Sequence, residues 1–189
     1  MVVINRNVQE FSKAKDGDKN ISKNFKIKEF ACQDGSDKIL IDLDMIPVLQ
    51  TIRDVGGRVT INSAYRTPTH NKNVGGASRS FHLYGRAFDI VSERLSTTDV
   101  CNLANSLGVK GIIKYPTFVH IDSRIDKYHA DNNGKYLTYG KYEQTALDYL
   151  VSKGRITDVI YWQNRLSSVK WLIIKWAADV AKLEANNIQ

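Results

Sequence analysis

Two short segments carry histidine and aspartate side chains at a spacing that restricts how the chain can fold. They are residues 80–89 (SFHLYGRAFD) and residues 118–122 (FVHID). In one continuous helix, His82 and Asp89 would share a face but lie about 10 Å apart along the axis. Gly85 gives the chain a place to turn, so that Asp89 falls on a following strand and both side chains can reach one point. His120 lies on a later predicted strand and would join them there.

Histidine and aspartate are ligand types that zinc takes in proteins. Zinc binds imidazole nitrogen and carboxylate oxygen at about 2.0–2.2 Å, and a catalytic site uses three protein ligands and keeps a fourth position for water. His82, Asp89 and His120 form such a set of three. Imidazole and carboxylate also bind other divalent metals, and zinc is the one that we expect for this set. We therefore predict one Zn²⁺ ion per chain, held by these residues.

Hydrophobic periodicity predicts the elements around these segments. Apolar residues three and four apart predict a helix over 43–55, capped by Asp42 or Asp44. The remaining patterns predict strands over 59–63 and 87–91, a helix over 96–107, and a strand, turn and strand over 110–122. Segment 66–79 is rich in turn residues, and such a long loop within a compact domain is typical of a functional site. This order without a regular βαβ alternation indicates an α+β fold.

The chain divides into three predicted parts. Residues 1–20 are interpreted as an N-terminal arm, or as a first strand followed by a turn. Residues 21–140 would form the main domain, and an apolar content of 42% is enough for a core in a chain of 189 residues. Residues 141–189 have helical apolar spacing and predict a small helical module. We expect this module to pack on the main domain or on a second copy of the chain, as a homo-oligomer.

Net charge and cysteine content exclude few classes of protein. A net charge of +7 favours polyanionic partners, including anionic wall polymers, but no run of like charges or nucleic-acid motif indicates nucleic-acid binding. Cys32 and Cys101 are expected to be buried thiols, because a disulfide scaffold would use more cysteines. Residues 1–20 lack the pattern of a signal peptide, and no apolar stretch is long enough to span a membrane. Synthesis in the cytoplasm is therefore expected.

The motif S-x-H-x-x-G-x-A-x-D at 80–89, followed by the apolar-His-x-Asp strand at 118–122, resembles the zinc D-alanyl-D-alanine peptidases. These include cell-wall carboxypeptidases, D,D-dipeptidases and phage endolysin endopeptidases. Asn24-Phe25 with Glu29-Phe30 is similar to the entry segment of the subgroup found in phages and Gram-positive bacteria. The segment SAYRTP at 63–68, with Asn71 and Gly75-Gly76, resembles the arginine loop of the family. The resemblance covers roughly residues 22–124.

The resemblance implies a hedgehog/DD-peptidase-like fold with a central antiparallel sheet. It implies that His82, Asp89 and His120 are the metal ligands, and that Arg66 binds a carboxylate or carbonyl of the substrate. Ser80 is a candidate substrate-binding residue whose other role is to fix the turn before His82. His70 and His129 lie outside the motif and are expected to be exposed to solvent.

One position departs from the family pattern. Many members carry an acidic general base three residues before the last ligand, where this chain has Thr117. Asp122 is the substitute candidate, because residues two apart on a strand share a face and Asp122 therefore accompanies His120. Its other possible role is to orient the imidazole of His120. Tyr115 either donates a hydrogen bond to a developing oxyanion or only packs.

These features predict a zinc-dependent peptidase that hydrolyses peptidoglycan peptides, as a D-Ala-D-Ala carboxypeptidase or as an endopeptidase. The alternative is a non-catalytic, zinc-containing module that binds the cell wall. A third hypothesis, a basic helical nucleic-acid binder, would depend on residues 142–186. We expect action at the bacterial cell wall after release, as for a phage or prophage lysin.

Overall fold

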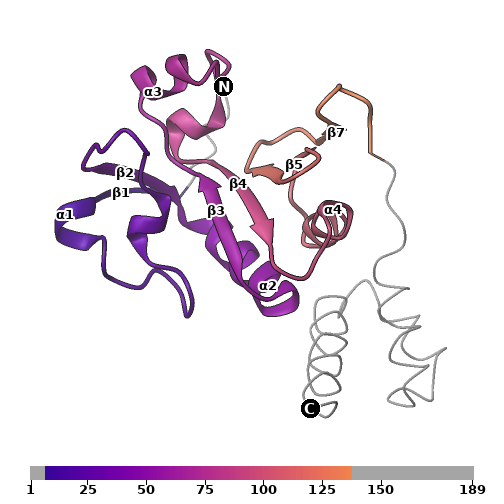
Figure 1. Cartoon of the computed structure of the whole chain (residues 1–189), viewed down its shortest axis with the longest axis horizontal. Coiled ribbons are helices and arrows are strands. Elements are labelled where there is room, and N and C mark those ends of the chain that lie inside the picture. The colour runs from indigo at the N-terminus through magenta and orange to yellow at the C-terminus, as the bar shows by residue number, and fades with distance from the viewer. Residues whose placement is uncertain (1–6, 138–189) are drawn as a thin grey trace, which may run out of the picture.

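The structure, a computed structural model, describes residues 7–137, which form a small α+β fold (Figure 1). The helices are α1 (Lys13–Asp16), α2 (Ile46–Gly56), α3 (Pro68–Asn73) and α4 (Thr97–Ser106), with 3-10 turns η1 (Ile27–Phe30), η2 (Leu43–Met45) and η3 (Phe81–Tyr84). The strands are β1 (Val8–Ser12), β2 (Lys38–Asp42), β3 (Val59–Ser63), β4 (Ala87–Ser92), β5 (Gly111–Lys114), β6 (Val119–Asp122) and β7 (Tyr128–Asp131).

A five-stranded sheet with the order β3-β4-β6-β5-β7 forms the centre of the described residues. Its strands pair antiparallel except β5 and β7, which run parallel. A separate two-stranded sheet pairs β1 with β2. The predicted α+β class with a central, mostly antiparallel sheet is therefore confirmed.

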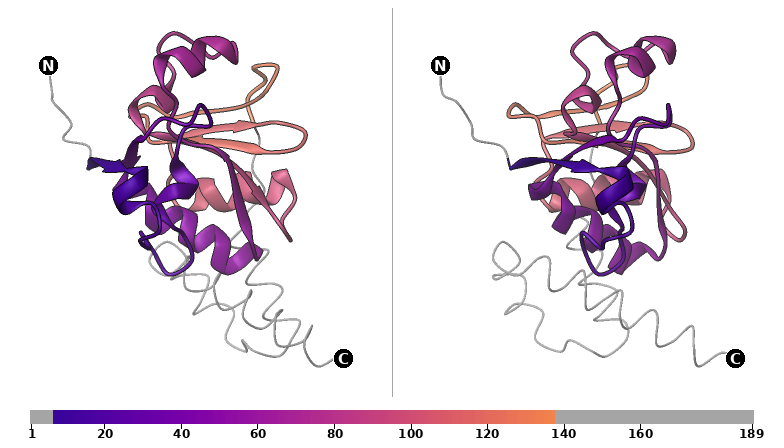
Figure 2. Two further views of the ribbon diagram at one scale, coloured as in Figure 1. Left: turned by 60° about the vertical axis from the view of Figure 1, so that its left-hand side comes forward. Right: turned by 90° about the vertical axis from the view of Figure 1, so that its left-hand side faces the viewer.

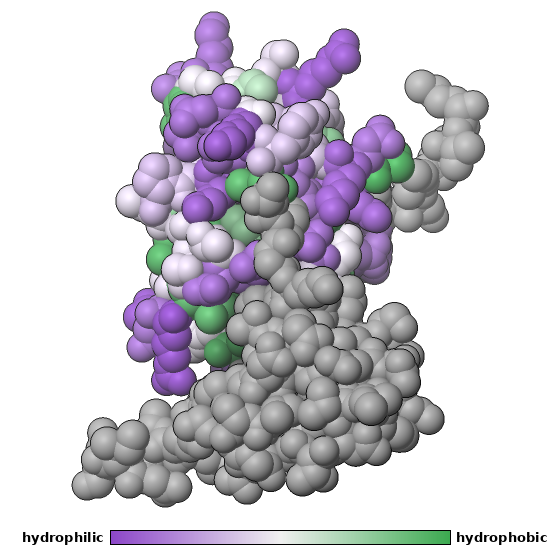
Figure 3. Space-filling model, turned by 90° about the vertical axis from the view of Figure 1, so that its right-hand side faces the viewer, coloured by the Kyte–Doolittle hydropathy of each residue, from purple (hydrophilic) through white to green (hydrophobic). Residues whose placement is uncertain are grey.

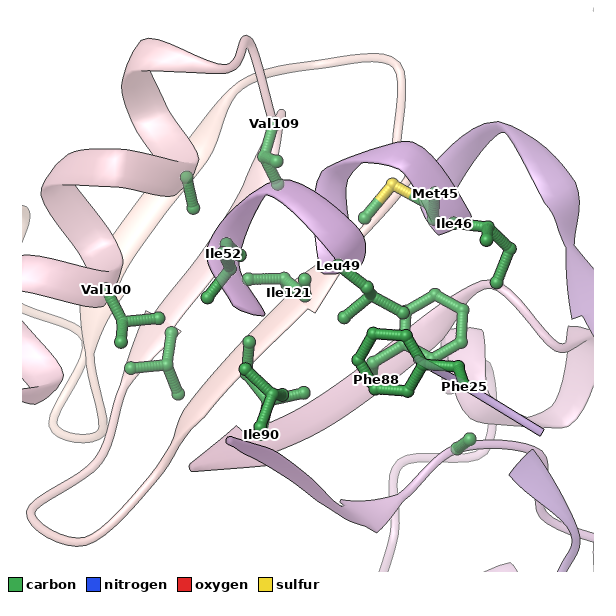
Figure 4. Close-up of a cluster of buried hydrophobic side chains, with 14 of the residues drawn as sticks. Phe25, Met45, Ile46, Leu49, Ile52, Phe88, Ile90, Val100, Val109 and Ile121 are labelled. Atoms are coloured by element: carbon green, nitrogen blue, oxygen red, sulfur yellow. The ribbon is translucent and has the colours of Figure 1, made fainter. Parts of the chain in front are cut away.

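The hydrophobic core lies between one face of this sheet and helices α2 and α4 (Figure 2). Leu49 and Ile52 of α2 and Val100 of α4 point toward Phe88, Ile90 and Ile121 of the sheet, and Phe25 joins them from the N-terminal part (Figure 4). Burial of these side chains supplies the main driving force for folding.

The opposite face of the sheet carries the polar residues, because side chains alternate along a strand. On β4, Asp89 stands between the core residues Phe88 and Ile90, and on β6, His120 and Asp122 flank Ile121. Helix α3 and η3 lie on this side of the sheet (Figure 2). The sequence thus places a core on one face and a cluster of titratable side chains on the other.

Most predicted elements agree with the structure to within a few residues. The predicted helix over 43–55 is η2 followed by α2, and the side chain of Asp42 caps it by accepting from the backbone of Asp44. Ser96 caps α4 in a capping box with Asp99. Cys32 and Cys101 are free and buried, as expected.

One segment differs from the expectation, and a second decides between two alternatives. The predicted loop over 66–79 contains the six-residue helix α3, which begins after the cap Thr67 with Pro68 in its first turn. At the N-terminus, residues 8–12 form a strand, which was one of the two interpretations of this segment. This strand, β1, pairs with β2 along its length, and α1 follows directly. The described part of this segment therefore packs with the rest of the fold instead of forming a loose arm.

The predicted helical module at 141–189, and the oligomerisation expected through it, lie outside the described residues. Within residues 7–137, every helix is too short or too polar to cross a lipid bilayer. The face over α4 and β7 shows mostly hydrophilic side chains, with apolar atoms in small separate areas (Figure 3). The described part of this face thus shows no broad apolar surface.

Candidate metal centre

Two features of the backbone bring His82 and Asp89 together. His82 lies on η3, and Gly85 ends this turn in the left-handed conformation with φ 65°. Gly85 also packs against the backbone of Leu40, which leaves no room for a side chain. The chain then enters β4, where Asp89 pairs directly with His120 of β6. The turn predicted at Gly85 and the placement of Asp89 on the following strand are both as expected.

The side chains of His82, Asp89 and His120 converge on one point. Oδ1 of Asp89 lies 2.8 Å from Nδ1 of His120 and 3.3 Å from Nε2 of His82. The two histidine nitrogens are 3.2 Å apart. One ligand atom from each residue lies within 4.8 Å of the others, and the group is buried. The structure therefore brings together the three predicted ligands.

The other nitrogen of each imidazole has an acceptor of its own. Nδ1 of His82 donates to the carbonyl oxygen of Ala64 at 2.6 Å, and Nε2 of His120 donates to Oδ2 of Asp122 at 3.0 Å. Acceptors in these positions fix the ring orientation and direct a lone pair from Nε2 of His82 and Nδ1 of His120 toward the shared point. This donor set fits zinc: two imidazole nitrogens and one carboxylate oxygen, with a position left for water.

Asp122 is fully buried and has hydrogen-bond partners on both sides. Beyond His120, its carboxylate accepts from Nε of Arg124 at 2.8 Å and from Nη2 at 2.5 Å. Burial raises the pKa of Asp122, but the bonds from Arg124 and His120 outweigh it and hold that pKa well below its usual range. A carboxylate in this state is ionised and accepts hydrogen bonds.

Asp89 is held by Arg66 on the side away from the histidines. Nη2 of Arg66 donates to Oδ2 of Asp89 at 2.6 Å, and Nε of Arg66 donates to the hydroxyl of Ser63 at 2.8 Å. Burial raises the pKa of Asp89, but hydrogen bonds with His120 and His82 outweigh it and leave the pKa well below its usual range. Arg66 thus leaves the other oxygen, Oδ1, directed at the shared point.

A bulge in β3 places Ser63 beside this pair. The register shifts between Ile61 and Ser63, so that Ile61 opposes Ile90 on the core face while Ser63 opposes Asp89 on the polar face. In a regular strand, residues two apart point to the same face. The extra residue of a bulge reverses that orientation. The bulge therefore turns the hydroxyl of Ser63 toward Arg66.

Tyr115 lies on the rim of the centre, at the β5–β6 hairpin. Its ring stacks on Phe118 with centroids 4.2 Å apart and planes 9° from parallel. Burial raises the pKa of Tyr115, and the negative charge of Asp89 acts in the same direction. Thr117 is exposed at the tip of this hairpin. The structure shows a packing contact for Tyr115, and the choice between its two candidate roles stays a prediction.

The loop after α3 is shaped by Asn71. This residue is buried, and its Nδ2 donates to the carbonyl of Ala77 at 3.0 Å. A side chain at Gly76 would overlap the amide of Asn71, which explains the glycine there. Asn71 therefore holds together the loop that leads to Ser80. Ser80 stands before η3, where its carbonyl accepts from Leu83 while its hydroxyl does not cap the turn.

The expectation that His129 is exposed was wrong. His129 is buried on β7, where Nε2 donates to the carbonyl of Val109 at 2.9 Å. His70 on α3 is half-buried. Both lie outside the cluster of His82, Asp89 and His120.

Sequence reasoning missed two residues of the centre. Arg124 was not considered, although it continues the pattern H-x-D-x-R from His120. Gly111 was not considered either; it lies opposite Asp122 and leaves space for that carboxylate. The arginine two positions beyond the candidate residue Asp122 is the sequence signal that points to Arg124.

A comparison with protein-family models agrees with this geometry. The family model described as Peptidase M15 matches residues 23–122, a range that contains all three converging side chains and Arg66. This chain belongs to the peptidase M15 family. The resemblance to zinc D-alanyl-D-alanine peptidases is thereby confirmed, and membership supports a metallopeptidase of a zinc-dependent family. A search of curated proteins found no match.

Proposed function

We propose that this M15 family member is a zinc-dependent peptidase that hydrolyses peptide bonds of peptidoglycan. The observation that carries the proposal is the convergence of His82, Asp89 and His120, each held by a further acceptor or donor. Such support is typical of a site built for a metal ion. When bound, zinc supplies Lewis acidity, which activates water and polarises a peptide carbonyl.

Arg66 is proposed to bind the substrate. Its Nε and Nη2 hold Ser63 and Asp89, whereas Nη1 makes no hydrogen bond within residues 7–137. The side chain is 16% exposed and lies beside Asp89 of the metal centre. A guanidinium fixed at two nitrogens offers the third to a carboxylate or carbonyl oxygen without a further loss of side-chain entropy.

Asp122 is proposed to orient His120, the second of its two candidate roles. Its carboxylate accepts from Arg124 and His120 and is fully buried. It thus stabilises the imidazole tautomer in which Nδ1 faces the shared point. For Tyr115 we propose a place in the wall of the substrate site, with Ser80 at the turn before His82.

Two features favour hydrolysis over the alternative of a non-catalytic module that binds the wall. A zinc site kept only for stability is closed by four protein ligands, whereas residues 7–137 supply three to this cluster. Arg66 also lies beside the cluster, and its Nη1 can donate to the carbonyl or carboxylate of a peptidase substrate. The cell wall as the place of action follows from the family, and the setting of a phage or prophage lysin stays a prediction.

The test is incubation of purified protein with peptidoglycan from several Gram-positive walls, followed by mass spectrometry of the released peptides. His82→Ala removes a proposed ligand, and His70→Ala is the matched control on α3. We expect release by the wild type and by His70→Ala, and none by His82→Ala or in the presence of a chelator. The fragment masses then identify the bond, as a terminal D-Ala-D-Ala bond or an internal one. Tight binding to the wall without release would instead support the binding module.

A further inference from the structure

We propose that Arg124 is a positioning residue for the metal centre and acts through Asp122 on His120. The inference rests on the proposed function, because it concerns the same site. Arg124 lies just beyond the end of β6, outside the set of converging ligands. Its side chain returns toward the sheet to reach the carboxylate of Asp122.

Arg124 donates hydrogen bonds to both carboxylate oxygens of Asp122. Its Nε lies 2.8 Å from Oδ1 and 3.1 Å from Oδ2, its Nη2 lies 2.5 Å from Oδ2, and its backbone nitrogen donates to Oδ1 at 3.0 Å. A planar guanidinium that binds a carboxylate in this way fixes both its position and its rotation. Oδ2, the oxygen that accepts from His120, is therefore held in one place.

Two aromatic rings hold the guanidinium of Arg124. Its central carbon lies 5.2 Å from the centroid of the Phe81 ring and 4.9 Å from that of the Tyr128 ring. Cations at such distances from a ring are attracted by its negative face. Phe81 directly precedes His82 on η3. Arg124 thus contacts the element that carries the first histidine and, through Asp122, orients the last.

This arrangement explains why a carboxylate can be fully buried beside a metal centre. A buried charge is costly unless it is paired and hydrogen-bonded. If Arg124 is shortened to an uncharged side chain, Asp122 keeps only His120 and a backbone nitrogen as partners. Its carboxylate is then free to rotate, and the ring of His120 loses its fixed orientation. Partners of metal-bound histidines contribute about 10- to 100-fold to metal affinity.

The experiment compares zinc binding by Arg124→Met, Arg124→Lys and the control Arg86→Met with that of the wild type. Arg86 is a matched control because it also stacks on Phe81, at 4.9 Å, while its guanidinium binds Ser123. Zinc affinity is measured by competition with a chromophoric chelator. The absorption spectrum of the cobalt-substituted protein reports on ligand geometry, and denaturant unfolding of the zinc-free protein reports on stability.

We expect Arg124→Met to weaken zinc binding about 10- to 100-fold and to change the cobalt spectrum. Arg124→Lys should weaken it less, because an ammonium keeps the charge but loses the planar fork. Arg86→Met should keep the wild-type affinity and spectrum even where it lowers stability. If Arg124→Met does not fold, Arg124→Lys and its spectrum carry the test.

Wild-type affinity and an unchanged spectrum in the folded Arg124 variants would overturn the proposal. An equal loss of affinity in Arg86→Met would also overturn it, because the effect would then be one of general stability. These results differ from a failure of the proposed function, in which the wild-type protein would bind zinc and release no peptide, or would bind no zinc at all.

Discussion

Gly111 on β5 lies directly opposite Asp122 on β6, and the carboxylate of Asp122 fills the space that a side chain at position 111 would need. Gly111 does not have a left-handed backbone conformation. Glycine is therefore needed at this position because there is no space for a side chain. The absent side chain lets Asp122 stand beneath His120 and accept from its Nε2. A residue on β5 thus contributes to a centre whose proposed ligands lie on η3, β4 and β6.

Gly111→Ala is expected to displace Asp122 and to weaken zinc binding. Forcing a methyl group into a packed interior costs about 1–3 kcal/mol of unfolding free energy. Gly108→Ala is the control, because Gly108 has open space around it and a φ of 82°, so that only backbone strain is added. Denaturant unfolding and chelator competition should show a loss of stability in both variants and a loss of zinc affinity in Gly111→Ala alone. Equal zinc affinities would contradict this role of Gly111.

Arg66→Lys should lower kcat/KM on peptidoglycan peptides about 10- to 100-fold. The reason is that a charged hydrogen bond contributes about 1.5–3 kcal/mol, and a lysine cannot hold Ser63, Asp89 and a substrate oxygen together. Arg53→Lys is the matched control; this arginine lies on α2 and stacks on Phe25. Steady-state kinetics would refute the role if the two variants had equal activity.

Asn71→Ala is expected to loosen the loop over 74–79. The substitution removes the bond from Nδ2 to the carbonyl of Ala77, which costs about 1–2 kcal/mol. Arg79 in this loop is exposed and offers a trypsin site. Limited trypsin digestion followed by mass spectrometry should show faster cleavage after Arg79 than in the wild type. Asn73→Ala, at an exposed position of the same helix, should leave the rate unchanged.

His129 predicts a pH dependence of stability. Burial lowers its pKa, and the positive charges of Lys127 and Arg124 act in the same direction. As the pH falls below the unfolded value of about 6.5, the unfolded chain binds a proton before the folded one, so stability decreases toward the folded pKa. His129→Gln keeps a donor for Val109 and cannot titrate. Between pH 7.5 and 5, its free energy of unfolding should fall less than that of the wild type; parallel curves would contradict the assignment.

The converging side chains were predictable because their residue types and the turn at Gly85 carry the information locally. A strand over 87–91, which carries Asp89, was predicted as well. Periodicity also predicted α2, which buries one apolar stripe, and the cap Ser96 with Gly108 predicted α4. These features depend on neighbours within a few residues along the chain.

What the missed residues do depends on contacts between segments, which the local sequence does not show. Arg124 lies beyond the end of β6. Its hydrogen bonds to Asp122 form because the side chain folds back toward the sheet and packs on Phe81 and Tyr128. His129 lies among polar residues, so nothing nearby indicates that β7 would bury it against β5. Helix α3 is too short for a hydrophobic period and depends on its cap, Thr67.

The most direct test of the central claim is a zinc titration of chelator-stripped protein, with release of peptide from peptidoglycan as the readout. We predict that activity is absent without zinc, rises in proportion to added zinc and reaches a plateau at about one ion per chain, as a site with three protein ligands requires. His82→Ala should stay inactive throughout the titration. Full activity in the stripped protein, or zinc binding at the centre without any peptide release, would contradict the claim.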